Sequence, residues 1–169
     1  MKKMLALIVA ALLALSAAAF AETYRSGDIT FEYDEKAFEV TVDDRTDDET
    51  TVVLHGNNEA WGTTFIGFYL KDLDDGAKFP TMDELSENPD TTVTQGEWNG
   101  YQNVFMYSIE RDDGVTESFF IAPVMDDDGR EIDDMLTVQI GVSKIEDESA
   151  AMARDDAISA VVDSLKVDN

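Results

Sequence analysis

The chain has 169 residues, with 37 acidic side chains, 12 basic ones, one histidine and no cysteine. Its formal net charge of −25 argues against nucleic acid and anionic lipid as partners, because both are bound through basic surfaces. The lack of cysteine excludes disulfides, a thiolate nucleophile and cysteine-ligated zinc. Length and a hydrophobic content of 44% fit one acidic domain with a core of its own.

Residues 1–21 have the pattern of a secretory signal peptide. Two lysines precede the apolar stretch 4–15, and residues 19–21 read Ala-Phe-Ala, a typical cleavage site. The apolar stretch is shorter than the roughly 20 residues that span a bilayer. We therefore predict that residues 22–169 form a single secreted domain, extracellular or in the periplasm or cell envelope, with no membrane span after cleavage.

The first half of this domain has the pattern of β-strands. Residues 29–33, 38–42 and 51–55 alternate apolar with polar side chains, as half-buried strands do. Residues 61–70 form a longer run rich in aromatic and β-branched side chains, which also favours a strand.

A short helix and a hairpin are predicted next. Thr81 and Glu84 have the spacing of a capping box, which predicts a short helix that ends near Asn88. Two extended runs, 91–98 and 101–110, are joined by Asn-Gly, a favoured hairpin turn.

Two further strands and one long helix complete the chain. The strands are predicted at 115–124 and 135–142, and the second of these is the last strand that the sequence predicts. Over 149–165 the apolar positions recur with helical spacing, and Asp147 and Ser149 are candidate N-caps. The predicted class is α+β, an antiparallel sheet of about six to eight strands with a short mid-chain helix and the long C-terminal helix packed on one face. The residues expected to face the sheet are Ile158, Val161, Val162 and Leu165.

This order of elements resembles the PsbP/Mog1-like fold. The shared features are the strand order, the short capped helix at 81–85, the hairpin segment 96–100 and the closing sequence Val-Val-Asp-Ser-Leu-Lys at 161–166. The resemblance covers nearly all of the domain and implies an exported, non-catalytic module that binds a partner. It transfers no functional residue, because no site motif of the family is present here.

The lone histidine and a few aromatics are the first candidates for a site. His55 has no second imidazole or thiol to complete a transition-metal site, so we interpret it as structural or surface. Trp61, Trp98 and Tyr101 are candidates for a surface that binds a ligand, for example by stacking on sugar rings, although such aromatics also cap the edges of a core.

The acidic loop 126–134 offers hard oxygen ligands of the kind that Ca²⁺ prefers. Its spacing does not match an EF-hand, since positions one and twelve would be Val124 and Met135. We therefore interpret the loop as a turn and expect no cofactor, with calcium as the alternative. The calcium candidates are Asp126, Asp128, Glu131 and Asp133.

No nucleophile motif, metal cluster or phosphate-binding loop is found in the sequence. We therefore expect a secreted, non-catalytic binding or structural module, with an unidentified protein or envelope partner. The alternatives are a small extracellular hydrolase that uses an Asp/Glu pair, and a calcium-binding acidic domain.

Overall fold

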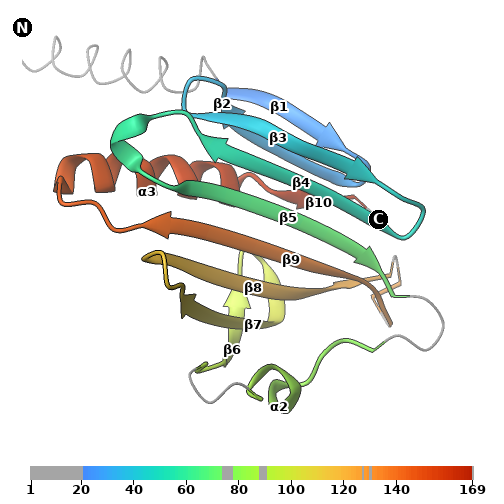
Figure 1. Ribbon diagram of the computed structural model, residues 1–169. Coiled ribbons are helices and arrows are strands. Elements are labelled where there is room, and N and C mark those ends of the chain that lie inside the picture. Colours follow the sequence, from blue (N-terminus) through green and yellow to red (C-terminus); the bar gives the residue numbers. More distant parts are fainter. Residues whose placement is uncertain (1–20, 74–77, 88–90, 127, 130, 169) are drawn as a thin grey trace, which may run out of the picture.

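The structure is a computed structural model that describes residues 21–73, 78–87, 91–126, 128–129 and 131–168. The predicted signal peptide lies outside the described residues, except for Ala21. The described chain is an α+β fold with two antiparallel sheets and a long C-terminal helix (Figure 1).

The larger sheet has seven strands, within the predicted range. Its spatial order is β3-β4-β5-β9-β8-β7-β6, and every neighbouring pair is antiparallel. The strands are β3 (Phe38–Arg45), β4 (Glu49–Gly56), β5 (Thr64–Asp72), β6 (Thr94–Trp98), β7 (Tyr101–Glu110), β8 (Val115–Met125) and β9 (Ile132–Ser143).

The smaller sheet is not predicted by the sequence. It has three strands in the order β1-β2-β10, where β1 is Ala21–Ser26, β2 is Ile29–Asp34 and β10 is Lys166–Val167. β9 is therefore not the last strand, and the expectation of a single sheet is wrong. Local periodicity finds β2 but cannot show that its partners lie at the two ends of the domain.

The helices begin where the capping signals place them. α2 (Met82–Leu85) has the complete capping box between Thr81 and Glu84. α3 (Glu148–Asp163) begins after Asp147, whose carboxylate accepts hydrogen bonds from the first backbone amides. Neither helix has the length and apolar composition that crossing a bilayer requires, and no other α-helix is present among the described residues.

The start of the predicted strand 61–70 differs from expectation. Glu59–Trp61 form a 3-10 turn, η1, and β5 begins only at Thr64. Gly62 between them has φ of 58°, a left-handed conformation that glycine adopts without strain and that interrupts an extended strand.

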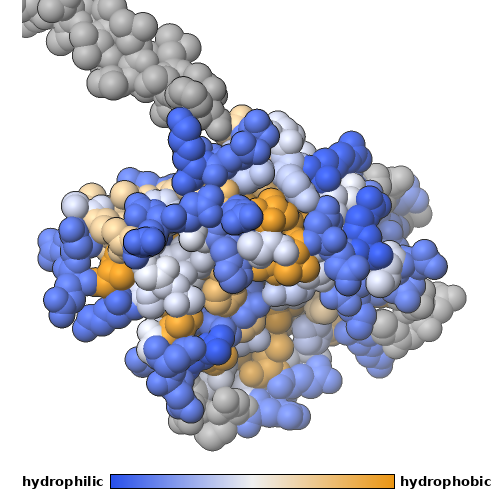
Figure 2. All heavy atoms as spheres, turned by 45° about the horizontal axis from the view of Figure 1, so that its top comes forward, coloured by the Kyte–Doolittle hydropathy of each residue, from blue (hydrophilic) through white to orange (hydrophobic). Residues whose placement is uncertain are grey.

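The core lies between the larger sheet and a layer made of α3 and the smaller sheet (Figure 1). Phe31 of β2 meets Phe68 of β5 with ring centroids 4.9 Å apart, so the two sheets pack directly on each other. The predicted apolar stripe of the helix is buried in the same core, as expected. Figure 2 turns the top of Figure 1 toward the viewer. On this side the surface carries mostly hydrophilic side chains, with separate apolar spots.

Candidate binding site at the edge of the large sheet

The face of the larger sheet that points away from the core carries a row of aromatic side chains. Side chains alternate along a strand, so Ile66 and Phe68 of β5 point into the core, whereas Phe65 and Tyr69 point to the opposite face. We call this the open face. Its half-buried aromatics are Phe65, Tyr69, Tyr107 and Phe119.

Two glycines allow the rings on this face to lie against the strands. A Cβ on Gly141 would stand 2.1 Å from the ring of Phe65, and one on Gly67 would stand 2.7 Å from the ring of Tyr69. The Tyr69 hydroxyl donates a hydrogen bond of 3.0 Å to Gln139, which fixes its ring. The open face is therefore a layer of rings held flat on the sheet.

Part of the open face is covered by the segment before α2. Phe79 stacks on Phe105 of β7, with ring centroids 5.6 Å apart and planes 20° apart. Phe105 is consequently only 7% exposed. The covered part lies beside Phe105 in the middle of β7, and the half-buried Tyr107 follows two residues later on the same face.

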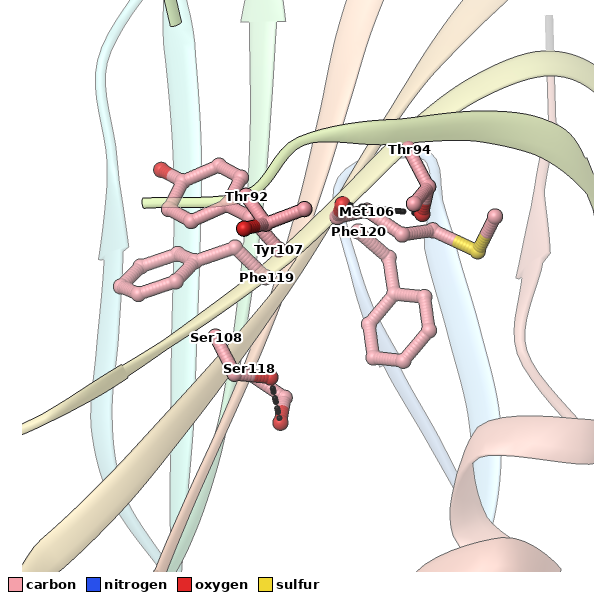
Figure 3. Close-up of a pocket in the computed structure, with 8 residues that line it drawn as sticks. All are labelled: Thr92, Thr94, Met106, Tyr107, Ser108, Ser118, Phe119 and Phe120. Carbon is pink, nitrogen blue, oxygen red and sulfur yellow. Dashed lines mark hydrogen bonds between the residues drawn. The ribbon is translucent and has the colours of Figure 1, made fainter. Parts of the chain in front are cut away.

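At this point of β7 the surface is hollowed. Tyr107 and Phe119 are paired across β7 and β8, and their rings stack at 4.8 Å with planes 15° apart. A cavity of about 390 Å³ opens beside them at the edge of the sheet, and we call it the edge cavity (Figure 3). Thr92, Thr94, Met106 and Ser108 also line it.

The edge cavity combines apolar and hydroxyl groups. In Figure 3, Tyr107 and Phe119 lie on one side of the two strands and Met106 and Phe120 on the other, as the alternation of a strand requires. The hydroxyls of Ser108 and Ser118 are 2.9 Å apart in a hydrogen bond between the two strands. Apolar contacts and hydroxyl hydrogen bonds are the means by which such a surface can hold a ligand.

An ion pair between a buried carboxylate and a largely exposed arginine supports the adjacent part of the open face. Glu117 of β8 is only 7% exposed, and its carboxylate accepts a hydrogen bond of 2.8 Å from Arg111. Arg111 also pairs with Asp113 in the β7–β8 turn at 3.3 Å, and these carboxylates raise the pKa of its guanidinium. The charge of Arg111 is therefore compensated by Glu117 and Asp113, and the guanidinium is not available as a free cation.

The three aromatics selected from the sequence lie elsewhere. Trp61 is 5% exposed and packs on Phe38, so the prediction that it forms part of a binding surface is wrong. Trp98 is half-buried and stacks on Phe120 at 4.7 Å. Tyr101 lies opposite Trp98 in the hairpin, half-buried against the core, and burial raises its pKa. The three residues do not form one exposed platform.

The acidic loop after β8 shows the geometry of a turn. The Asp126 carbonyl accepts a hydrogen bond from Gly129, which has φ of 66°, and the Asp126 carboxylate accepts one from the amide of Glu131. No group of acidic side chains suited to hold a metal is found among the described residues, which leave out 127 and 130 of this loop. Calcium binding by Asp126, Asp128, Glu131 and Asp133 stays the untested alternative to the interpretation of this loop as a turn.

A separate cleft of about 310 Å³ is lined mainly by carboxylates. It lies between the β1–β2 turn, the β3–β4 hairpin, the end of β5 and the beginning of β9, and it includes Asp28, Asp72 and Asp134. Burial, and the neighbouring carboxylates Asp133, Asp72 and Asp28, raise the pKa of Asp134 to about 6. Within the described residues no aromatic side chain lines this cleft.

His55 lies at the end of β4 and is exposed. Its ring is 6.0 Å from that of Phe65, so it borders the open face. No metal-ligating group accompanies it among the described residues.

Comparison with known proteins does not assign this chain to a family. No protein-family model matches the sequence, and no curated protein matches it.

The residues of the edge cavity could not be selected from sequence alone. Tyr107 and Phe119 occupy alternate positions in runs that are predicted as strands, so a side chain at either position could face the core or the surface. Which face is open is decided by α3 and by the smaller sheet, whose strands come from the two ends of the domain.

Proposed function

We propose that this protein is a secreted, non-catalytic binding module that holds a protein partner at the edge cavity and on the adjoining open face. The observation that carries the proposal is the stacked pair Tyr107–Phe119 beside a cavity of about 390 Å³ at the rim of a sheet. Paired rings supply a large apolar contact area at low entropic cost, which is why aromatic side chains dominate protein interfaces.

The chemistry of the surface supports binding over catalysis. The hydroxyls of Ser108 and Ser118 are bonded to each other, and no imidazole lies near them among the lining residues. A serine without an adjacent base is a weak nucleophile. Secretion and the PsbP/Mog1-like fold are parts of the same proposal, supported by the leader-like sequence and by the order of elements described above.

A double substitution on the open face tests this function. The variant Tyr107→Ser/Phe119→Ser removes both rings and leaves the core residues unchanged, whereas Met152→Ser changes a side chain that is 67% exposed on α3. Affinity capture from native culture fluid and envelope extract should retain a partner on the wild-type protein and on the Met152 variant, and lose it on the double variant. Equal capture by all three proteins, each checked by its melting temperature, would contradict the proposal.

The alternative function, a hydrolase, is supported by the acidic cleft that contains Asp134. A half-buried aspartate whose pKa is raised to about 6 can donate a proton near neutral pH, and Asp134 lies opposite Asp72 in the β5–β9 ladder. The variant Asp134→Asn would abolish such an activity toward a glycoside substrate and leave capture of a partner unchanged. Loss of capture in this variant would instead connect the acidic cleft with binding.

A further inference from the structure

Near its C-terminal end, β7 has no neighbouring strand on its outer side among the described residues. β6 begins at Thr94, which lies opposite Met106, whereas β7 continues to Glu110. Residues 107–110 therefore extend beyond the edge strand. We call this segment the β7 edge, and the edge cavity lies beside its first half.

Two hydrogen bonds determine which backbone groups point outward. The amide of Arg111 donates to the carbonyl of Val115 across the turn to β8 at 2.8 Å, and the Thr94 hydroxyl donates to the carbonyl of Met106 on the β6 side at 3.2 Å. Backbone groups of successive residues in a strand point to alternate sides. Tyr107 and Ile109 therefore bond to β8, as Arg111 does, whereas the N–H and C=O groups of Ser108 and Glu110 point away from the sheet.

These outward groups have the pattern of an unfinished ladder. Pairing with β8 is regular from Phe105 to Glu110, without a register shift, so the backbone groups of this segment alternate regularly between the two sides of the strand. No backbone partner of Ser108 or Glu110 on the outer side is found among the described residues. Unpaired groups of this kind form a template on which another strand can add.

The opposite edge of the sheet is protected in a way that the β7 edge is not. β3 carries an irregularity between Val40 and Val42, and its second half consists largely of charged residues, Asp43, Asp44 and Arg45. Bulges and charges are the usual protection of an edge strand against pairing. The β7 edge has regular pairing and one charged residue, Glu110.

A strand added here would have contacts for both sets of its side chains. On the open face its side chains would lie beside Tyr107 and Ile109, which are half-buried. On the other face they would lie beside Met106 and Ser108, where the edge cavity gives them room. The site thus offers main-chain hydrogen bonds for affinity and a cavity for specificity.

The negative charge around the β7 edge favours a basic segment as the added strand. The chain has a net charge of −25, and Glu110 is followed by Asp112 and Asp113 in the turn. Arg111 is already paired with Glu117 and Asp113. A second copy of this chain would bring an equal negative charge to the same edge, whereas a basic segment is attracted to it.

We propose that an extended, basic segment of the partner protein adds to the larger sheet as a new strand beside residues 107–110 of β7. This inference rests on the proposed function at the same surface and specifies how the partner is held. The backbone of Ser108 and Glu110 supplies the hydrogen bonds, and the edge cavity receives alternate side chains of the segment.

The test uses a synthetic probe and two substitutions of one residue. The probe is a nine-residue peptide of alternating lysine and valine, compared with the same peptide carrying a central proline and with a peptide of alternating glutamate and valine. Ser108→Pro removes the outward N–H without removing a bond to β8, and Ser108→Ala keeps the N–H and removes only the hydroxyl. We expect the Lys/Val peptide to bind wild-type and Ser108→Ala alike, and Ser108→Pro at least about tenfold more weakly.

Amide hydrogen exchange of the wild-type protein gives a second readout that does not depend on how Ser108→Pro folds. Saturation with the Lys/Val peptide should slow exchange at the Ser108 and Glu110 amides, because both become hydrogen-bonded, and should leave the already bonded Tyr107 amide unchanged. Unchanged exchange at Ser108 and Glu110 would overturn the proposal. Equal binding of the proline-containing peptide, or no binding of the Lys/Val peptide, would also overturn it.

The two proposals fail in different ways. If Tyr107→Ser/Phe119→Ser loses the native partner but Ser108→Pro keeps it, the surface binds by side chains alone and strand addition is wrong. If the double variant keeps the partner, the proposed function itself is wrong.

Discussion

Trp61 illustrates how a residue that is conspicuous in the sequence can have a purely structural place. Its ring is buried against Phe38, and its indole Nε1 has no hydrogen-bond partner within the described residues. The packing of the ring therefore stabilises the fold, whereas its N–H group is buried without compensation.

This arrangement predicts unequal effects of two substitutions at position 61. Trp61→Ala should cost about 3–5 kcal/mol of unfolding free energy, because it leaves a cavity. Trp61→Phe should cost much less, about 1 kcal/mol, because it keeps an aromatic ring and removes the unpaired N–H. Urea titrations of both variants measure the difference. If Trp61→Phe is as damaging as Trp61→Ala, the indole nitrogen has a partner that stabilises the fold.

Asp134 gives the protein a pH dependence of a definite sign. Its folded-state pKa is raised from 3.8 to about 6, so the folded state takes up its proton more readily than the unfolded state does. The stability from this group is fully present below pH 3.8 and is lost as the pH rises through about 6. Because Asp134 is only partly buried, solvent screening limits the effect to about 1 kcal/mol.

The variant Asp134→Asn carries a neutral side chain at every pH. We expect its unfolding free energy to exceed that of the wild type at pH 7 by about 1 kcal/mol, and to match the wild type near pH 4. Chemical denaturation at the two pH values measures both quantities. A variant that is less stable than the wild type at pH 7 would show that the ionised carboxylate has a stabilising partner.

At the scale of elements, α3 completes the core of the larger sheet. Val162 is 5% exposed, and the carbonyl of this residue accepts a hydrogen bond of 3.0 Å from Asn99 of the β6–β7 turn. The helix therefore contacts the hairpin that carries the β7 edge as well as the buried strands.

A new carboxylate should strongly destabilise the domain on the buried side of α3 and have little effect on its exposed side. Val162→Asp buries an unpaired carboxylate and should cost more than about 4 kcal/mol, enough to unfold the domain. Met152→Asp places the same group where the side chain is 67% exposed and should change stability by less than about 0.5 kcal/mol. Circular dichroism melts compare them, and a folded Val162→Asp variant with an unchanged melting temperature would refute this packing.

Elements defined by local signals could be predicted from the sequence. The Thr81–Glu84 capping box and the Asn99–Gly100 turn each depend on residues that are adjacent in the chain, and both form as predicted. The smaller sheet could not be predicted, because β2 pairs with β1 on one side and on the other with β10, a two-residue strand more than a hundred positions away. The β7 edge depends on where β6 begins, and the sequence predicts that extended run three residues earlier, at 91.

At the scale of the whole molecule, the chain has a net charge of −25, and many acidic side chains of the described residues lie in turns and at strand ends. Examples are Asp43 and Asp44 at the end of β3, and Asp112 and Asp113 between β7 and β8. Like charges at this density repel one another, and salt screens them over a Debye length of about 8–10 Å near physiological ionic strength.

We therefore expect the melting temperature to rise with sodium chloride concentration. Magnesium and calcium should stabilise the protein equally when compared at one ionic strength, because a diffuse layer of carboxylates does not distinguish them. Thermal melts in the three salts measure this. Saturable stabilisation by micromolar calcium alone would instead assign a specific site, with Asp126, Asp128, Glu131 and Asp133 as its candidate ligands.

The central claim is that the partner is held at the stacked pair Tyr107–Phe119 on the rim of the larger sheet. Photocrosslinking tests this most directly, with a benzophenone amino acid placed at Tyr107 in one protein and at the exposed Met152 in another. After irradiation in native culture fluid or envelope extract, position 107 should give one discrete adduct, whose crosslinked peptide is basic, and position 152 should give none. An adduct formed only from position 152, or no adduct at 107, would contradict the claim.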